Sequence, residues 1–444
     1  MALANYDSVF QRVGILVHVL LGATIEDGIV RPDNSPRIAK LPMALTRERL
    51  TANIRFVKLH DVEGVPTPKP VGPPKSCVEA VHLRGYWPGI RSLVGLVETP
   101  VLRADGTILT NPGYDSQTSL IYEPAGDTPT ILDAPTLDDA KQSLATLLDV
   151  VSDFPFDKPE HKAGWIASVL TPIARHAFAG PSPLFLVDAN VAGSGKGILI
   201  DCTALIITGR RMAVMSQPRD DAEFRKRITA LALFGDTIVL IDNVARALGG
   251  PSLDAALTAT TWKDRLLGRS ETVELPLRAT WFATGNNVML QGDMSRRVCH
   301  VRLDCKHENP EERRGFKYPN LQIHAREHRA QLLAAALTIL RAWFVAEKPD
   351  MGLRPWGSFD GWSSVIHNAI VWTGTPDPGA TREELLSRAD RDSAALRDLI
   401  EGWQEIDPEG NGLTASEALK KLEDNPNMYD TLRGAILELC DPHR

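Results

Sequence analysis

The sequence lacks paired cysteines, a membrane-spanning apolar run and an excess of positive charge. Its five cysteines show no C-x-x-C spacing, which argues against a zinc site and favours reduced thiols in a cytosolic setting. The apolar run Val13–Ala23 is far too short to cross a bilayer and no charged-then-apolar leader opens the chain, so we expect a cytoplasmic protein without a membrane partner. Because the net charge is −7, any nucleic-acid contact must come from local clusters of Lys and Arg.

Apolar patterning divides the 444 residues into three parts. Residues 1–150 carry short β-prone runs between turn signals, which predicts a β-rich accessory or oligomerisation domain. From 151 to 346, buried-strand runs alternate with helical segments, which predicts a parallel sheet covered on both faces. Residues 347–444 have mostly helical spacing, and a winged-helix-like domain is one form that they could take. The predicted fold class is α/β, with a β-rich N-terminal region and a helical C-terminal region.

Three local signals make further structural predictions. Asp105-Gly106 lies between two β-prone runs and predicts a hairpin. The proline-rich stretch Gly64–Ser76 predicts an extended surface connector. Thr414, with Glu417 three residues later, predicts a capping box at the start of a helix.

A glycine-rich turn lies within the stretch LVDANVAGSGKGILI, residues 186–200, between a predicted strand and a predicted helix. Glycines in such a turn let successive N–H groups face an oxyanion at the helix N-terminus, and Lys196 can reach the terminal phosphates of a nucleotide. The usual pattern is G-x-x-x-x-G-K-[ST], but here Asn190 replaces the first glycine and Gly197 replaces the hydroxyl residue. Alone, the turn also fits an ordinary strand–turn–helix, so phosphate binding depends on the residues that follow.

The strand DTIVLIDNV ends in Asp242 and Asn243. A carboxylate at the C-terminal end of a strand can hold magnesium directly or through water, although an isolated aspartate there is more often a cap or turn residue. Many nucleotide hydrolases place a glutamate base after this aspartate. Asn243 can position a water but cannot accept its proton, so we expect slow turnover or a base located elsewhere.

Two further polar groups follow along the chain. The strand ATWFATGNN ends in Asn286 and Asn287, and in a parallel sheet its tip would lie between the lysine and the aspartate, where an amide can sense the γ-phosphate. G-N-N also suits a plain turn. Arg296 and Arg297 come next. Arginine from a neighbouring subunit can stabilise the charge of phosphoryl transfer, whereas adjacent arginines are otherwise typical of a solvated surface.

In this order the glycine-rich turn, LIDN, ATGNN and SRR resemble the superfamily 3 helicase branch of the AAA+ ATPases. The resemblance is closest to primase–helicase proteins of phages, prophages and other mobile elements. DRLLGRSETVELPLRATWFATGNNV, RGYWPGIRSLVGLVETPVLRADGTILTNPGYDSQTSLIY and GSFDGWSSVIHNAIVWTGTPDP also resemble that group. The resemblance implies a P-loop AAA+-like core over 151–346 with ATP and Mg²⁺ as cofactors. It also implies a homo-oligomeric ring, commonly a hexamer, on single-stranded or forked DNA, with a primase as a further partner, in the cytoplasm of a bacterial or phage-infected cell.

The resemblance also implies roles for individual residues. Asp242 would hold magnesium, Asn286 would be the sensor with Asn287 as the alternative, and Arg296 or Arg297 would act in trans. A hairpin ahead of the sensor strand would contact DNA, although charged edges also suit a plain surface hairpin. The predicted nucleotide-binding residues are Asn190, Ala192, Gly193, Ser194, Gly195, Lys196, Gly197 and Ile198. The predicted catalytic residues are Lys196, Asp242, Asn243, Asn286, Arg296 and Arg297, and the predicted DNA contacts are Lys263, Arg265 and Arg269.

Three functions stay open on the sequence. The first is an ATP-driven DNA helicase or translocase that serves replication of a phage or mobile element. The second, favoured by Gly197 and Asn243, is a nucleotide-switched assembly on DNA, a replication initiator or phage-defence component with little or no hydrolysis. The third is a small-molecule kinase, against which the arginine pair and the helical tail argue.

Overall fold

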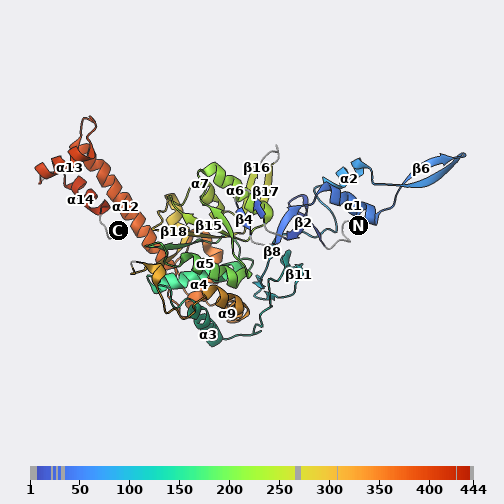
Figure 1. Ribbon diagram of the computed structural model, residues 1–444, viewed down its shortest axis with the longest axis horizontal. Helices are drawn as coiled ribbons and strands as arrows, with labels where there is room; N and C mark the ends of the chain where they lie inside the picture. The colour runs from blue at the N-terminus through green and yellow to red at the C-terminus, as the bar shows by residue number, and fades with distance from the viewer. Residues whose placement is uncertain are drawn as a thin grey trace. The chain divides into compact units, whose positions relative to one another are not determined.

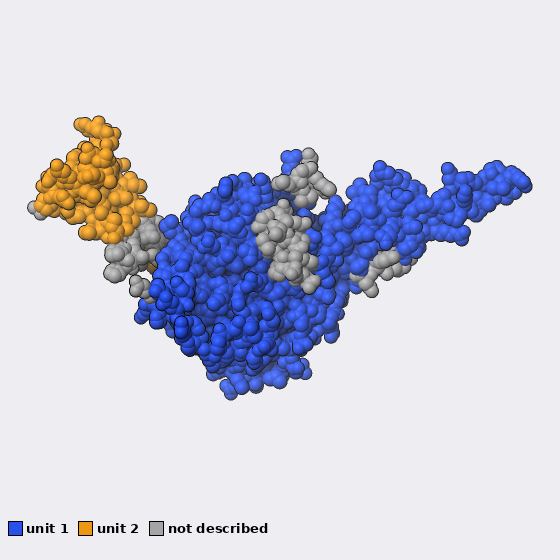
Figure 2. Space-filling view, in the orientation of Figure 1, with its two compact units in different colours: residues 1–379 blue, residues 380–444 orange. Residues whose placement is uncertain are grey.

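The computed structural model describes residues 8–21, 24–26, 29–31, 36–265, 272–307, 309–426 and 428–440. The chain forms two compact units, residues 1–379 and 380–444 (Figure 2). Among the described helices, none has both the length and the apolar character that crossing a lipid bilayer requires.

A five-stranded parallel sheet forms the centre of the larger unit, in the order β19-β13-β18-β15-β14 (Figure 1). All six residues of β13 are buried, as expected of a strand with both faces covered. The predicted mixed α/β fold, with a parallel sheet and flanking helices, is confirmed. The strands are β13 (Leu184–Ala189), β14 (Ala213–Ser216), β15 (Ile238–Val244), β18 (Thr280–Asn286) and β19 (Val298–Leu303), and the antiparallel strands β4 (Ile29–Arg31) and β3 (Thr24–Glu26) extend the sheet beyond β14.

Helices enclose one large apolar core together with this sheet. The core continues into the segment after residue 346, where Trp356, Phe359 and Trp362 are almost fully buried. The helices of this unit are α3 (Leu137–Val150), α4 (Pro159–Ile173), α5 (Lys196–Thr208), α6 (Asp221–Phe234), α7 (Pro251–Thr258), α8 (Leu321–Glu327), α9 (Arg329–Val345), α10 (Asp360–Trp362) and α11 (Asn368–Trp372). Three short 3-10 helices are η1 (Gly292–Arg296), η2 (Pro310–Glu312) and η3 (Gly357–Phe359), and η4 (Ser363–His367) is a short π-helix.

The N-terminal region is built from two helices and small sheets, which are antiparallel except where Gly95–Val97 pairs parallel with Leu120–Tyr122. Strands β9 and β10 pair antiparallel around Asp105-Gly106, so the hairpin predicted there is confirmed. The elements are β1 (Val9–Arg12), β2 (Ile15–Leu21), β5 (Pro36–Lys40), α1 (Met43–Asn53), β6 (Phe56–Val62), β7 (Val65–Val71), α2 (Lys75–His82), β8 (Gly95–Val97), β9 (Val101–Leu102), β10 (Ile108–Leu109), β11 (Gly113–Asp115) and β12 (Leu120–Tyr122). A separate hairpin, β16 (Thr261–Arg265) with β17 (Thr272–Pro276), lies between β15 and β18 in the sequence.

The prediction of an extended connector over Gly64–Ser76 is wrong. This stretch forms β7, which pairs antiparallel with β6, and then the start of α2. Prolines are usually rare in strands because they cannot donate a ladder hydrogen bond. Here they occupy every second position of β7, so their nitrogens all lie on the edge that faces away from β6.

Buried arginines tie loops and strands to helix ends. Arg12 of β1 donates to the carbonyls of Ala232 and Leu233, at 2.9 and 2.7 Å, at the end of α6. Arg329 donates to the carbonyl of Leu205 in α5 at 3.2 Å and to that of Ala125 at 3.0 Å. The last carbonyls of a helix have no partner within the helix and carry its negative dipole end, so a guanidinium there stabilises the junction.

The smaller unit is helical. Thr414 and Glu417 form the predicted capping box, in which each side chain bonds the backbone N–H of the other residue. Its apolar core is small and contains Ile406, Leu422 and Leu432. Its helices are α12 (Gly379–Ile406), α13 (Ala415–Asp424) and α14 (Asp430–Leu439).

Candidate functional site

The glycine-rich turn connects β13 directly to α5. Gly193 and Gly195 have φ values of 75° and 95°, which are accessible to glycine without strain. Gly195 is the N-cap of α5, and no side chain caps this helix. The first N–H groups of α5 therefore have no side-chain acceptor, and together with the helix dipole they favour an anion at this point. Ala192 lies exposed in the same turn.

Lys196, the first residue of α5, is held by the turn and by a neighbouring strand. Its ammonium donates to Ser194 Oγ at 3.2 Å, to the carbonyl of Val191 at 3.3 Å, and to Asn286 Oδ1 at the tip of β18. Burial lowers the pKa of Lys196, and the charge of Asp188 partly offsets this effect. The structure thus brings together Lys196 and Asn286, which are 90 residues apart in the sequence.

Strand order places this contact next to Asp242. β18 pairs with β13 on one side, with Asn286 opposite Ala189, and with β15 on the other. The β15–β18 register shifts between Ile241 and Val244, so Asp242 and Asn243 lie in an irregularity of the kind that often re-aims side chains near active sites. Both residues are exposed at the carboxyl edge of the sheet.

Thr284 holds the irregularity in place. Its buried hydroxyl donates to Asp242 Oδ1 at 2.6 Å and accepts the backbone N–H of Asn243 at 3.0 Å. Asn243 has a φ of 53°, a left-handed conformation that asparagine tolerates better than most residues. Sequence reasoning missed Thr284, because a threonine inside an apolar strand ordinarily indicates only β-propensity.

Asn190 and Asn287 connect the turn to the residues around the end of β19 through side-chain hydrogen bonds. The Asn190 amide donates to Asp304 Oδ1 at 2.8 Å and accepts the N–H of Cys305 at 3.0 Å. The Asn287 amide donates to the carbonyl of Asn190 at 3.1 Å and accepts from Arg302 at 3.0 Å. These side chains bind the chain itself rather than face the open side of the turn.

A buried carboxylate lies beneath the turn. Asp188 of β13 accepts from Arg302 at 2.6 Å, lies 3.4 Å from His300 Nε2, and accepts the N–H of Val288 at 3.1 Å. Burial alone would raise the pKa of Asp188, but these bonds and the nearby positive charges outweigh burial and lower it. The result is a polar framework that fixes the ends of β13, β18 and β19 relative to one another.

Arg296 and Arg297 lie near the amino-terminal ends of the parallel strands, opposite the carboxyl edge that carries Lys196. The carbonyl of Arg297 accepts the N–H of Leu184, the first residue of β13, whereas Lys196 follows the end of that strand; the strand alone spans about 17 Å. The Arg297 guanidinium pairs with Asp254 of α7 and lies 3.7 Å from Asp293. Arg296 is exposed, and among the described residues it has no acidic partner.

The predicted DNA contacts lie partly on the β16–β17 hairpin. Lys263 and Arg265 point to its exposed face, with Lys263 opposite Glu274. The other face carries Asp264, which accepts from Arg225 of α6 at 2.8 Å and so fixes the hairpin to that helix. Arg269 lies outside the described residues.

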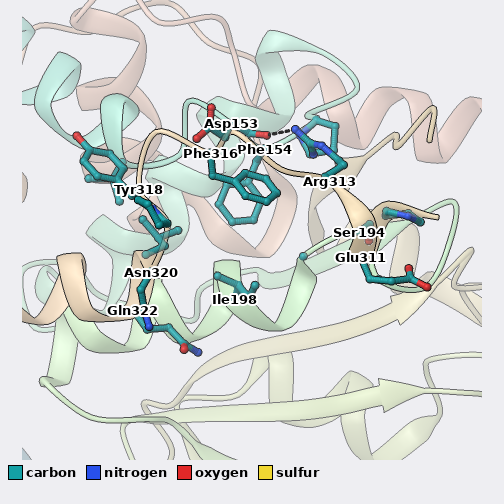
Figure 3. A pocket seen from close by; sticks show the side chains of 17 residues that line it. Asp153, Phe154, Ser194, Ile198, Glu311, Arg313, Phe316, Tyr318, Asn320 and Gln322 are labelled. Atoms are coloured by element: carbon teal, nitrogen blue, oxygen red, sulfur yellow. Dashed lines mark hydrogen bonds between the residues drawn. The ribbon is translucent and has the colours of Figure 1, made fainter. Parts of the chain in front are cut away.

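A cavity of about 450 Å³ opens beside the turn. This volume is typical of a small-molecule site. Phe154, Ile198 and Phe316 form its apolar part, and Asn320 and Gln322 add polar groups (Figure 3). The lining residues are Val150, Asp153, Phe154, Pro155, Gly193, Ser194, Gly195, Ile198, Pro310, Glu311, Arg313, Phe316, Tyr318, Pro319, Asn320, Leu321 and Gln322.

The far wall of the cavity is fastened to the end of α3. Arg313 donates to the carbonyl of Asp153 at 3.1 Å (Figure 3), and Tyr318 donates to Asp149 at 2.6 Å. The Tyr318 ring also stacks on His324, with ring centres 3.8 Å apart. The sequence analysis did not predict this wall. The available signal was the group of aromatic and basic residues in RRGFKYPN.

Glu311 lies directly over the turn. A Cβ placed on Gly193 would be only 2.7 Å from Glu311 Oε2. A carboxylate at this position opposes the attraction that the turn and Lys196 exert on an anion.

Neither a protein-family model nor a curated protein sequence matches the chain. Solved structures similar to it include the apo A form of the NrS-1 C-terminal region, with 12% identity and a TM-score of 0.42 over 97% of this chain and 86% of that chain. The SCCmec type IV Cch active helicase has 10% identity and a TM-score of 0.34, over 87% of this chain and 82% of that chain. The JCV helicase has 13% identity and a TM-score of 0.23, over 53% and 66%. Similarity at this level establishes no activity for this chain.

Replacing Glu311 with glutamine should strengthen nucleotide binding at the turn. The substitution removes one negative charge beside the expected phosphates, and we expect the Kd for Mg²⁺-ATP to fall about three- to tenfold at low salt. Isothermal titration calorimetry measures this change. Glu312→Gln is the control, because it removes the same charge from the adjacent exposed position. Equal affinities for the two variants would contradict the prediction.

Proposed function

We propose that this chain is an ATP-driven DNA helicase or translocase that acts in replication of a phage or mobile element and hydrolyses ATP at the interfaces of a ring. The observation that carries the proposal is the convergence of Lys196, Asn286 and Asp242 at one edge of a parallel sheet. Nucleotides bind at this edge in open α/β sheets, where a glycine-rich turn leads into a helix.

A triphosphate fits the turn and the cavity together. Its phosphates would accept from the N–H groups of the turn, while Lys196 exchanges its contacts with Val191 and Ser194 for phosphate oxygens. The cavity beside Ser194 and Ile198 offers apolar side chains for a base, with Asn320 and Gln322 as hydrogen-bonding partners.

Magnesium fits one side of the same site. Only one Asp242 oxygen is bound by Thr284, and the carboxylate is exposed toward the turn's edge of the sheet. Within the described residues no group of three or more His, Cys, Asp or Glu forms a metal cage, but Mg²⁺ commonly uses one or two carboxylates and completes its shell with phosphates and water. When bound, the ion would neutralise charge on the phosphates.

Asn286 would orient the attacking water, because its amide lies at the strand tip between the lysine and the aspartate. Neither Asn286 nor Asn243 can take the proton of that water. The second candidate function, a nucleotide-operated switch on DNA with little hydrolysis, is favoured by Asn243, which occupies the irregularity of β15 where a base would be useful.

Arg296 is the stronger candidate for an arginine that acts in trans. Arg297 is paired with Asp254, whereas Arg296 is exposed at the edge of the sheet remote from its own Lys196. A ring, commonly a hexamer, would bring Arg296 of one copy to the nucleotide of the next. Lys263 and Arg265 of each copy would contact DNA inside the ring, and a primase partner stays a prediction.

Lys196→Ala should abolish turnover, because the substitution removes the charge that contacts the phosphates. We expect at least a hundredfold loss of kcat in a steady-state ATPase assay with and without single-stranded DNA. Lys141→Ala, at an exposed position of α3, is the control. DNA-stimulated turnover supports the motor, and tight ATP binding without turnover supports the switch. A protein that stays monomeric and retains no nucleotide would refute both.

Gly197→Thr should raise the hydrolysis rate by restoring a hydroxyl in the first turn of α5. A Cβ at Gly197 meets nothing within 4 Å, and replacing a helical glycine does not weaken the helix. We expect at least about a tenfold gain in kcat or in apparent Mg²⁺ affinity. Gly197→Ala separates the hydroxyl from the backbone effect. If the alanine and threonine variants have equal rates, the hydroxyl has no role.

Arg296→Ala should lower kcat by about a thousandfold without changing the free energy of unfolding. Arg297→Ala should instead destabilise the fold by about 1–3 kcal/mol, because Asp254 loses its partner. Mixing Arg296→Ala with Lys196→Ala provides the test in trans: random assembly leaves about a quarter of the interfaces complete, so activity should return. Two inactive proteins that stay inactive when mixed would exclude the trans role.

A further inference from the structure

One segment of the N-terminal region, residues 36–91, has a charge opposite to that of the whole chain. Residues 36–91 contain ten Lys or Arg but four Asp or Glu, a net charge of +6 in a chain of −7. Positive charge concentrated in this way attracts polyanions even when the protein as a whole is acidic.

The most exposed part of this region is the β6–β7 hairpin. The two strands pair only with each other, and every residue except the half-buried Phe56 is exposed. Lys58 and Lys69 are directly opposite each other on the same face. Like charges at opposing positions destabilise a hairpin, and an isolated two-stranded hairpin is only marginally stable. The stability of the hairpin therefore does not explain why two lysines face each other here.

The prolines of β7 restrict how the hairpin can bind. Pro66, Pro68 and Pro70 alternate with the residues that pair toward β6, so the outer edge of β7 has no N–H groups in this stretch. Such an edge resists addition of another strand. Recognition through the side chains of the exposed faces is favoured instead, and the face shared by Lys58 and Lys69 also carries His60 and Thr67.

Further cations surround the base of the hairpin. A Cβ at Gly72, just after β7, would lie 3.5 Å from Arg47 Nη2, so this arginine of α1 lies beside the strand end. Arg55 lies between α1 and β6 and is exposed. Among the described residues, Arg47, Arg55 and the two hairpin lysines have no acidic partner.

The surroundings of His18 show the same positive field. Burial, followed by the charges of Arg49 and Arg37, lowers the pKa of His18. In the same region, burial and then Lys40 lower the pKa of His82. Positive side chains therefore act on both histidines of this part of the N-terminal region.

We propose that the β6–β7 hairpin and the adjoining end of α1 form a nucleic-acid binding surface in which Lys58, Lys69 and Arg47 contact the phosphate backbone. The surface is separate from the β16–β17 hairpin and needs neither ATP nor hydrolysis. A two-stranded ribbon fits the major groove of a duplex, and its cations also suit a single strand, so the shared ligand is the phosphodiester backbone. An acidic protein is the competing partner.

Substitutions at the lysine pair separate binding from folding. Lys58→Glu places Glu opposite Lys69, an attractive cross-strand pair, so the hairpin should be at least as stable while binding falls. Lys58→Gln with Lys69→Gln removes the repulsion and both phosphate contacts. The control is Lys141→Gln with Lys420→Gln, which changes the net charge equally at exposed positions of α3 and α13.

Fluorescence anisotropy with labelled single-stranded and duplex oligonucleotides, in the full chain without nucleotide, measures the effect. We expect both lysine variants to bind at least about fivefold more weakly than the control, and the double variant to lower the slope of log K against log salt by about 1.4 to 1.8. The probe that loses more affinity identifies the preferred strand form. Unchanged oligonucleotide binding in both variants would overturn the proposal. If the variants change only the self-association of this acidic chain, the surface binds an acidic protein instead. ATPase activity without DNA should be unaffected, so failure here is distinct from failure of the proposed function.

Discussion

The candidate site depends on the contact between Lys196 and Asn286, which joins the start of α5 to the tip of the neighbouring strand. The two residues meet because β18 lies between β13 and β15, with all carboxyl ends at one edge. The same strand order brings Asp242 to the next position along that edge. A different order would leave the glycine-rich turn with a lysine but without the amide of Asn286 and the carboxylate of Asp242 beside it. The amide also accepts a hydrogen bond from an ammonium that is partly removed from water, which offsets part of the cost of burying that charge.

Behind these groups lies a layer of polar residues whose task is positioning. Asn243 and Asn287 adopt left-handed backbone conformations, which cost energy and persist only when neighbours fix them. Thr284 fixes the first through its hydroxyl, and Arg302 and the carbonyl of Asn190 fix the second. The departure of Asn190 from glycine thus has a structural reason: its amide joins the turn to the chain that follows β19.

Features that depend on neighbours in sequence were predictable. The parallel sheet, the hairpin at Asp105-Gly106 and the capping box at Thr414 follow from apolar periodicity, a two-residue turn and a three-residue spacing. The connector prediction for the proline-rich stretch was wrong because it rested on proline content alone. The prolines alternate with other residues, and β7 pairs with β6 through those other residues. The cavity could not be predicted, because its walls come from the end of α3 and from residues 310–322, on either side of the turn in sequence. No local pattern records that they meet.

On the proposed function, Gly197 and Asn243 would weaken hydrolysis in one copy more than they weaken nucleotide binding. Gly197 lacks a hydroxyl and Asn243 lacks a basic group, whereas the turn, the lysine and the cavity all lie within one chain. Glu311 would oppose bound phosphates and so would reduce the binding affinity as well. Arg296 lies at the far edge of the sheet, so its charge cannot compensate within the same copy. A single protomer would then bind ATP without hydrolysing it, and turnover would begin only when assembly supplies a guanidinium from a neighbouring copy. Since electrostatic stabilisation is usually the largest catalytic contribution, a site weakened in this way gains more from assembly than one already complete.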